Sequence, residues 1–421
     1  MQMDILDKNK YHFIGIGGIG ISAIARMFYL QGKKVTGSDV EKSEITDDLE
    51  KLGIRVKIGH KAENIEKDAE AIIYTVAILE DNPELAKARK RKIVCVTYPQ
   101  ALGELSKQMY TIAIAGTHGK TTTTAMIGHI LKKAGFDPTV IVGSKMLSDS
   151  EKSGGNFLAG KSKYLVVEAC EYKRSFLNLH PKILVITNIE AEHLDYYKDL
   201  DDIKSAFKEL ENKVPKDGHV IKESDYKKIK TDFELLIPGQ HNIWNAQAAI
   251  KTAEVLGIPN EKAKEYLKDF RGTWRRLEYK GEKDGNIFYD DYAHHPTEIR
   301  ASLSALRQKH PDKNLVCVFM PHTQSRTKLL FDDFVKELGV ADKIFITPIY
   351  ITRESPDDSI SNKILSDAIN KSAGQTSLSL PVENPTKLRE KLSQIKTAKP
   401  LCVVMMGAGS IYEWTKEILN K

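Results

Sequence analysis

The chain has few of the features that mark a membrane-bound, secreted or zinc-binding protein. Among its 421 residues no apolar run approaches the roughly 20 residues that a membrane-spanning helix needs. The first ten residues lack the apolar core of a secretory signal, so we expect a cytoplasmic protein. Only four cysteines occur, and none has Cys-x-x-Cys spacing, which predicts buried free thiols and no zinc site.

A large excess of one charge is also missing. The 63 basic and 57 acidic side chains leave a net charge of +6, which makes no case for a nucleic-acid partner but suits anionic ligands. We therefore expect neither a nucleic acid nor a membrane as partner. The hydrophobic fraction of 41% and the charged fraction of 29% are typical of a globular protein. The length predicts two to four domains of ~100–200 residues each.

One stretch, from Tyr110 to Thr124, combines a β-prone run, a glycine loop and the start of a helix. The loop reads Gly-Thr-His-Gly-Lys-Thr, and Ile114 stands where the usual phosphate-loop pattern has a further glycine. Backbone N–H groups of such a loop converge on an anion; Lys120 would face the β- and γ-phosphates and the Thr121 hydroxyl would face Mg²⁺. The alternative is a helix that merely starts after a glycine turn.

A second glycine motif, Gly15-Ile-Gly-Gly-Ile-Gly20, follows the β-prone run from Tyr11 to Ile16. A helix pattern and a strand ending in Asp39 come next, which is the order of the dinucleotide-binding βαβ fingerprint. The motif fits NAD, FAD or any nucleoside diphosphate, and a tight structural turn is the remaining alternative. His60 follows another predicted strand end, where it either contacts a ligand or is a surface histidine.

Carboxylates and a histidine follow two further strands of the expected central domain. Glu168 ends the run from Tyr164, and His193 follows the run from Lys182 to Thr187. The carboxyl ends of parallel strands share one edge with the phosphate loop, so both side chains are candidate metal ligands. The alternatives are a helix-capping Glu168 and a structural loop histidine. Asn245 lies near a helix start, where an amide reads adenine or merely caps the helix.

The last part of the chain opens with a polar corner. A β run from Ile287 ends in Asp290, Asp291 and Tyr292, and His294 and His295 precede a proline and a helix pattern. Five polar groups at a strand-to-helix corner indicate a binding or catalytic site, although a solvated corner with a capping aspartate is the alternative. The whole pattern predicts an α/β protein: a Rossmann-like domain (1–107), a central P-loop ATPase domain (108–272) and a Rossmann-like C-terminal domain (273–421).

Taken together, these motifs resemble the Mur ligases of peptidoglycan synthesis, and the similarity spans nearly the whole chain. The most specific stretches are His12–Gly20, Ala115–Thr124, Thr187–His193, Pro238–Asn242 and Asp290–Glu298. The last of them is similar to the branch of the family that uses UDP-N-acetylmuramate itself. The resemblance implies an ATP- and Mg²⁺-dependent ligase that joins L-alanine to the lactyl carboxylate of that nucleotide sugar through an acyl phosphate. ADP and phosphate are released, and the product serves cell-wall biogenesis, cell shape and cell division.

The resemblance also implies roles for individual residues. The UDP-sugar would contact Gly17, Gly18, Ile19, Gly20, Ser38, Asp39 and His60. ATP would contact Gly116, Thr117, His118, Gly119, Lys120, Thr121, Thr122, Asn245, Arg276 and Asp291. The metal ligands would be Thr121, Glu168 and His193, and the amino acid would meet Tyr292, His294 and Arg326. Lys120, His294 and Arg326 are the expected catalytic residues.

The sequence departs from the family pattern at several positions. Cys170 and Lys173 replace two acids that often follow the third strand of the central domain, and Thr323 replaces an arginine, which leaves Arg326 for the alanine carboxylate. Ala206 and Phe207 occupy the place where several relatives carry a carbamylated lysine, so we expect no carbamate.

Three competing interpretations remain at this stage. A muropeptide-recycling ligase would join a tripeptide to the same sugar. A dehydrogenase would explain the first glycine motif but not Lys120, and a nucleotide-switched binding protein would not explain the polar corner. The sequence does not separate a monomer from a homodimer.

Overall fold

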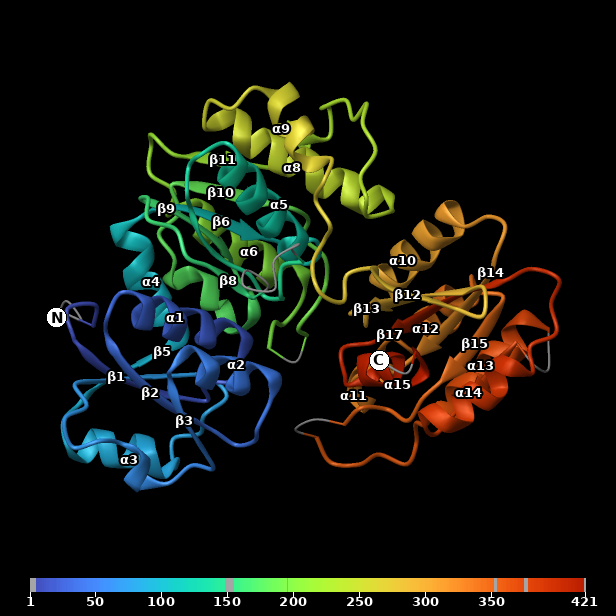
Figure 1. Ribbon diagram of the computed structural model, residues 1–421, viewed down its shortest axis with the longest axis horizontal. Helices are drawn as coiled ribbons and strands as arrows, with labels where there is room; N and C mark the ends of the chain where they lie inside the picture. The colour runs from blue at the N-terminus through green and yellow to red at the C-terminus, as the bar shows by residue number, and fades with distance from the viewer. Residues whose placement is uncertain (1–4, 148–154, 195, 352–353, 375–377, 420–421) are drawn as a thin grey trace. The chain divides into compact units, whose positions relative to one another are not determined.

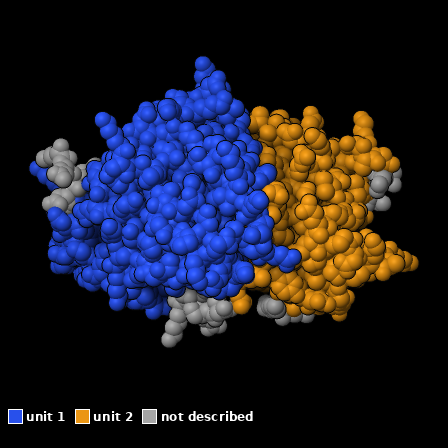
Figure 2. Space-filling view, turned by 90° about the horizontal axis from the view of Figure 1, so that it is seen from above, with its two compact units in different colours: residues 1–234, 244–270 blue, residues 235–243, 271–421 orange. Residues whose placement is uncertain are grey.

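The computed structural model of the chain divides into two compact units. The first comprises residues 1–234 and 244–270, and the second comprises residues 235–243 and 271–421 (Figure 2). The structure describes residues 5–147, 155–194, 196–351, 354–374 and 378–419, so the start of the N-terminal segment considered above lies outside it. Two β-sheets belong to the first unit and one belongs to the second. The predicted domain limits at 107 and 272 remain predictions.

The first sheet contains five parallel strands in the order β3-β2-β1-β4-β5. Alternate side chains enter different cores: Phe13 packs with helix α1, whereas Ile14 packs with helix α3. Figure 1 shows these two helices with the strands of the sheet between them. The order reverses between β1 and β4, which places the loop after β1 at the switch point of the sheet. The strands are β1 (Lys10–Ile14), β2 (Lys34–Asp39), β3 (Arg55–Ile58), β4 (Ala71–Tyr74) and β5 (Val94–Thr97); the helices are α1 (Ile19–Leu30), α2 (Glu44–Leu52), η1 (Ala62–Asn64), α3 (Pro83–Lys90) and α4 (Tyr98–Gln108).

The second sheet has the order β11-β10-β6-β9-β7-β8, and its buried strand β6 lies between β10 and β9. All of its pairs are parallel except the edge pair of β7 and β8. One core joins it to the first sheet within the same unit. The strands are β6 (Tyr110–Ala115), β7 (Thr139–Ile141), β8 (Phe157–Leu158), β9 (Tyr164–Glu168), β10 (Ile183–Ile186) and β11 (His219–Ile221); the helices are α5 (Lys120–Lys133), η2 (Tyr172–Asn178), α6 (Leu200–Glu211), α7 (Glu223–Tyr226), α8 (Gln240–Val255) and α9 (Asn260–Leu267).

The third sheet, in the second unit, has the order β12-β13-β17-β14-β15-β16. Cys317 and Val318 of β14 enter separate cores on its two faces. The strands are β12 (Glu278–Lys283), β13 (Asn286–Asp291), β14 (Asn314–Phe319), β15 (Lys343–Ile346), β16 (Ser379–Pro381) and β17 (Leu401–Met406); the helices are α10 (Pro296–Lys309), α11 (Gln324–Leu329), α12 (Phe331–Leu338), α13 (Asn362–Ala373), α14 (Pro385–Ser393) and α15 (Ile411–Leu419).

The α/β prediction is confirmed, with one difference at the edges of the sheets. We expected parallel strands, but β12 pairs antiparallel with β13 and β8 pairs antiparallel with β7. The four cysteines are free, as predicted, but the prediction that they are buried holds only for Cys317 and Cys402, since Cys95 is partly buried and Cys170 is exposed. Among the described residues, no helix is both long enough and apolar enough to cross a membrane.

Candidate active site

The phosphate loop lies between β6 and α5, at the carboxyl edge of the second sheet. Gly119 has a φ of +81°, in the left-handed region that favours glycine. A Cβ at this position would lie 2.4 Å from Asn245 Oδ1. Asn245 also accepts a hydrogen bond from Thr123 Oγ1 at 3.2 Å, so its amide packs directly against the loop and the first turn of α5. The loop and the predicted adenine-side residue are therefore neighbours.

Lys120 is held inside the loop. Its Nζ donates to the carbonyl oxygens of Gly116 and Thr117, at 2.5 and 2.9 Å, and forms an ion pair with Glu171 at 3.0 Å. Burial alone would lower the pKa of Lys120, but the carboxylates of Glu171 and Glu168 outweigh it and raise the pKa above its ordinary value. The loop therefore contains a full positive charge, which suits the terminal phosphates of a nucleotide.

Two residues of the loop are anchored to the segment after β10. The backbone N–H of Thr117 donates to Asn188 O at 3.0 Å, and that of His118 donates to Asn188 Oδ1 at 2.8 Å. These two N–H groups are thus engaged within the protein, contrary to the simple picture of a loop with all N–H groups on one anion. The first N–H groups of α5, from Lys120 to Thr122, have no partner inside the helix and remain the donors for a phosphate.

Thr121 and Glu168 meet as predicted. Strands β6 and β9 are neighbours, and Thr121 Oγ1 lies 3.1 and 3.0 Å from the two carboxylate oxygens of Glu168. Glu168 Oε2 also accepts from the Gly143 backbone N–H at 2.8 Å. A hydroxyl and a carboxylate next to a phosphate loop are the oxygen ligands that Mg²⁺ prefers.

His193 groups with different acids from the one expected. Its ligand atoms lie within 4.8 Å of carboxylate oxygens of Glu171 and Glu192, and we call these three residues the carboxylate cluster. The sequence prediction paired His193 with Glu168 and did not assign a metal to Glu171 or Glu192. His193 has a φ of +56° and its ring lies 4.9 Å from that of Tyr172, so its orientation is set by the backbone and one aromatic neighbour.

The carboxylate cluster fits a divalent cation. Glu171 is 4% exposed, and its Oε2 is buried with no hydrogen-bond partner in the described ranges. A buried carboxylate oxygen without a partner costs free energy that a cation ligand would recover. The cluster offers two carboxylates and an imidazole. Carboxylates are ligands that Mg²⁺ and Mn²⁺ prefer, whereas softer metals prefer thiolates.

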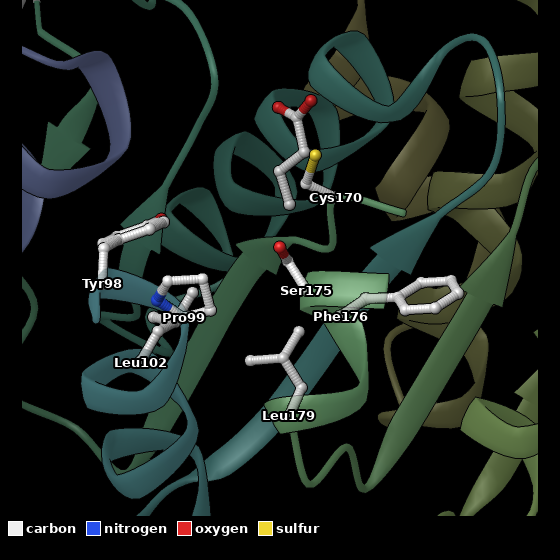
Figure 3. Close-up of a pocket in the computed structure, with 8 residues that line it drawn as sticks. Tyr98, Pro99, Leu102, Cys170, Ser175, Phe176 and Leu179 are labelled. Carbon is white, nitrogen blue, oxygen red and sulfur yellow. The ribbon is translucent and has the colours of Figure 1, made fainter. Parts of the chain in front are cut away.

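A pocket of about 300 Å³, its open mouth included, lies beside Glu168. Tyr98, Pro99 and Leu102 of α4 form one side, and Ser175 and Phe176 of η2 with Leu179, which directly follows η2, form the other, with Cys170 at one end (Figure 3). Tyr98 also reaches the glycine loop of the first sheet, because a Cβ on Gly20 would lie 2.7 Å from its hydroxyl. One ring is thus next to Gly20 and also lines the pocket that contains Glu168.

The glycine motif of the first sheet is braced by Asp39. The carboxylate accepts the Gly17 N–H at 2.7 Å and the Val40 N–H at 2.8 Å. The residue predicted to face the uridine is therefore engaged with backbone groups. Helix α1 starts at Ile19 with Gly18 as N-cap, and no side chain caps it, so the first N–H groups of α1, including that of Gly20, can bind a diphosphate.

Ser38 and His60 meet at the same edge of the first sheet. Ser38 Oγ lies 3.2 Å from His60 Nδ1, and both side chains contact Glu84. Glu84 was not identified from the sequence.

The polar corner of the second unit is more internal than expected. Asp291 is buried, and its carboxylate accepts from Ser302 Oγ at 2.7 Å and from the Ala293 N–H at 2.8 Å. Arg276 lies over the Tyr292 ring at 5.2 Å and 3.6 Å from Glu298. Asp291 thus organises the start of α10 rather than projecting from the surface.

The predicted amino-acid residues lie together in the second unit. His294 Nδ1 lies 3.0 Å from the Tyr292 carbonyl oxygen, so Nδ1 carries the proton and Nε2 carries the lone pair. His322 contacts the His294 ring, with centroids 6.1 Å apart, and stacks on Tyr350 at 5.7 Å. Arg326 Nη1 donates to the His322 carbonyl oxygen at 3.1 Å. No role was predicted for His322, although it directly precedes the departure at Thr323.

The predicted residues therefore fall into two sets. The first unit brings together both glycine loops, Glu168, His193 and Asn245, and the second brings together Arg276, Asp291, Tyr292, His294 and Arg326.

Three domain models of one protein family match consecutive parts of the chain. The chain matches the Mur ligase family catalytic domain over residues 10–110, the Mur ligase middle domain over 114–230 and the Mur ligase glutamate ligase domain over 275–409. UDP-N-acetylmuramate--L-alanine ligase of Caldanaerobacter subterraneus subsp. tengcongensis is 40% identical, over 100% of this chain and 99% of its own. The protein of the same name from Clostridium acetobutylicum is 42% identical, over 98% of each chain.

A solved structure of similar fold indicates the same family. The crystal structure of UDP-N-acetylmuramate-alanine ligase MurC from Thermotoga maritima superposes with a TM-score of 0.81 at 30% identity, over 98% of each chain. Sequence and structure, compared over almost the full length, establish that this chain belongs to the Mur ligase family.

Proposed function

We propose that the chain is an ATP-dependent amide ligase that joins L-alanine to the lactyl carboxylate of UDP-N-acetylmuramate. The reaction passes through an acyl phosphate and releases ADP and phosphate, in peptidoglycan precursor synthesis. The observation that carries this proposal is the identity of about 40%, over nearly the whole chain, to relatives that bear the name of this activity. The alternative, a tripeptide-recycling ligase, is not favoured by these relatives.

The phosphate loop would activate the carboxylate. A carboxylate does not react with an amine unless a leaving group is first attached, so its oxygen attacks the γ-phosphorus and ADP leaves. Catalysis of such a step is mostly positioning and charge neutralisation. Lys120 would exchange its loop carbonyl oxygens and Glu171 for phosphate oxygens, while the first N–H groups of α5 bind the other oxygens. Asn245, Arg276 and Asp291 are the remaining proposed ATP residues.

Thr121 with Glu168, and the carboxylate cluster, would hold Mg²⁺. A bound Mg²⁺ neutralises negative charge on phosphate and carboxylate oxygens. Lys120 is connected to both groups of ligands. Its ammonium contacts Glu171 of the carboxylate cluster, and the next residue, Thr121, contacts Glu168.

The glycine loop of the first sheet would bind the diphosphate through Gly17, Gly18, Ile19 and Gly20. Asp39 keeps this loop in shape, and Ser38 and His60 lie on the nucleoside side. The sugar would extend past Tyr98 toward the phosphate loop, because Tyr98 contacts Gly20 and lines the pocket next to Glu168.

The second unit would bind the amine substrate. Arg326 would pair with the carboxylate of alanine, and Tyr292 would contact the amino acid. His294 Nε2, which carries the lone pair, would accept a proton as the amine attacks the acyl carbon. Burial, His294 and Arg326 together lower the pKa of His322 to about 4, so this neighbour adds no positive charge at neutral pH.

We further propose that the enzyme works in the cytoplasm, as a monomer or a homodimer. The deciding experiment measures ADP release from ATP and Mg²⁺ with UDP-N-acetylmuramate and each of L-alanine, glycine, L-serine and the recycled tripeptide. We expect ADP release that requires the nucleotide sugar and is fastest with L-alanine. Equal release without an amine, or release with the tripeptide alone, would contradict the proposal.

A further inference from the structure

A buried carboxylate connects four polar side chains of the first sheet region. Glu84 is fully buried in the first turn of α3, where the Asn82 side chain accepts from its backbone N–H at 3.0 Å. Burial alone would raise the pKa of Glu84, but hydrogen bonds from His12, Asn64 and Ser38 outweigh it and lower the pKa below its ordinary value. The N-terminus of α3 also favours a negative charge. Glu84 is therefore an ionised carboxylate.

The two oxygens of Glu84 accept four hydrogen bonds. Oε2 lies 2.7 Å from His12 Nε2 and 2.8 Å from Ser38 Oγ, and Oε1 lies 3.0 Å from His60 Nδ1 and 2.9 Å from Asn64 Nδ2. An ionised carboxylate can only accept, so each partner must donate. His60 consequently carries its proton on Nδ1.

This assignment fixes the chemistry of the other ring nitrogen. In the neutral imidazole of His60, a proton on Nδ1 leaves a lone pair on Nε2. That Nε2 atom is buried, and the described residues offer it no hydrogen-bond partner. His12 differs, because its second nitrogen lies 2.9 Å from Thr36 Oγ1. A buried acceptor without a partner is costly, which points to a donor on a bound ligand.

His60 lies where the nucleoside of the UDP-sugar would be. It follows strand β3, which pairs with β2, and the Gly59 N–H donates to the Asp39 carbonyl oxygen at 2.7 Å. The carboxylate of the same Asp39 braces the diphosphate loop at Gly17. We propose that Glu84 is a positioning residue, which makes His60 present its Nε2 lone pair to an N–H or O–H donor of the uridine.

The inference rests on the proposed function and refines how its nucleotide is recognised. Uridine offers donors at uracil N3–H and at the ribose hydroxyls. Cytosine has an acceptor at N3, so a contact to N3–H would also exclude cytidine nucleotides. A site that hydrogen-bonds one group rejects analogues without it, because its own polar atom is then left unpaired.

The first measurement is the tautomer of His60, read from the ¹⁵N shifts of the histidine rings in the full chain. We expect the proton on Nδ1 and a change in the Nε2 shift when UDP binds. A proton on Nε2 in the free protein, or an Nε2 shift that does not respond to UDP, would overturn the inference.

The second measurement is calorimetric binding of UDP, N3-methyl-UDP, 2′-deoxy-UDP, 3′-deoxy-UDP and CDP. We expect about a tenfold loss for the analogue that lacks the donor meeting His60, which identifies that donor. In Glu84→Gln, UDP should bind about tenfold more weakly and that discrimination should shrink, with kcat at saturating substrate retained. Thr36→Val, which removes a partner of His12 but none of His60, should bind UDP within about twofold of wild type.

The outcomes distinguish a failure of the proposed function from a failure of the role of Glu84. A wild-type chain that binds no UDP contradicts the proposed function itself. Tight UDP binding that Glu84→Gln leaves unchanged, or that all analogues share, contradicts only the role of Glu84 and His60. The wild-type tautomer and the analogue series decide the question even if Glu84→Gln fails to fold.

Discussion

The ammonium group of Lys120 lies 3.0 Å from Glu171 Oε1, so an ion pair joins the phosphate loop to the carboxylate cluster. The same ammonium group is the expected partner of the nucleotide phosphates. ATP and Glu171 therefore compete for Lys120, and nucleotide binding would release a carboxylate at the point where a divalent cation is needed.

Glu171→Gln tests this exchange. The amide keeps the volume but removes the charge, so the Mg²⁺ concentration for half-maximal activity should rise about tenfold or more, while the KM for L-alanine stays unchanged. Glu261→Gln is the matched control, because its carboxylate is 80% exposed and outside the carboxylate cluster. A Mg²⁺ dependence equal to that of wild type would remove Glu171 from the metal site.

Lys120→Ala should abolish turnover but not sugar binding. The variant loses the positive charge that faces the transferred phosphate, so we expect kcat to fall by about 10³-fold. UDP-N-acetylmuramate should still bind with nearly its wild-type affinity, because the glycine loop belongs to another sheet. Calorimetric titration with the sugar nucleotide checks this, and loss of both properties would indicate misfolding.

His294→Asn should separate the two chemical steps. Without an imidazole to accept the amine proton, amide formation should slow by about 10²–10⁴-fold, whereas the acyl phosphate still forms. Trapping with hydroxylamine would detect the accumulated acyl phosphate in a single turnover. Equal loss of acyl phosphate and amide would place His294 in the first step instead.

Arg326→Lys should affect the amino acid specifically. Lysine keeps the charge but not the paired donors of the guanidinium, so the KM for L-alanine should rise about tenfold with little change in the KM for ATP. Lys328→Ala offers a control on the same helix, since this lysine is exposed and pairs with Asp357. An unchanged KM for alanine would leave its carboxylate to another residue.

Asp290 should make the second unit less stable at neutral pH than at acid pH. Burial raises the pKa of Asp290 to about 7, although a hydrogen bond from Thr415 works in the opposite direction. The folded state then binds a proton that the unfolded chain releases above its lower pKa, so this contribution to stability falls as pH rises from about 4 to 7. Asp290→Asn should remove that slope, for a gain of about 4 kcal/mol or less above pH 7.

Denaturant unfolding of wild type and Asp290→Asn between pH 5 and pH 8 measures this difference. Burial also lowers the pKa of His241 and of His322 to about 4, and their contributions rise over the lower part of this range. The difference between the two proteins isolates Asp290, because both histidines are present in each. A variant that is equally stable or less stable at pH 8 would contradict the prediction.

The features that depend on neighbouring residues in the sequence were predicted correctly. Both glycine loops and the strands before them depend on neighbouring residues, and the structure places them in β1, β6 and the helices that follow. The meeting of Thr121 with Glu168 also followed from the sequence, because parallel neighbouring strands end at one edge. This reasoning needs only that the strands of the sheet are parallel, which the alternation of strand and helix patterns indicates.

Contacts between residues on loops could not be predicted from local sequence patterns. His193 meets Glu171 through two loop segments, one after β9 and one after β10, and His193 itself has a positive φ that was not predicted from its sequence. The contact of Glu84 with His12 spans 72 residues and involves a helix with no strong apolar face. Neither leaves a local signal.

The antiparallel edge strand β12 was missed for another reason. Its sequence, Glu-Tyr-Lys-Gly-Glu-Lys, is polar, so the search for apolar runs passed over it. A usable signal was present in Asp284-Gly285, because both residues have positive φ and join β12 to β13 in a two-residue hairpin loop.

Tyr98 lies beside two of the proposed binding regions of the first unit. Its ring fills the space that a side chain on Gly20 would need, and it also lines the pocket beside Glu168. One aromatic ring therefore lies beside the start of α1 and also faces the pocket that contains Glu168. A substrate that is anchored at the first loop and extends toward Glu168 would pass this ring, so the size of the side chain at position 98 should affect which substrates the first unit can accept.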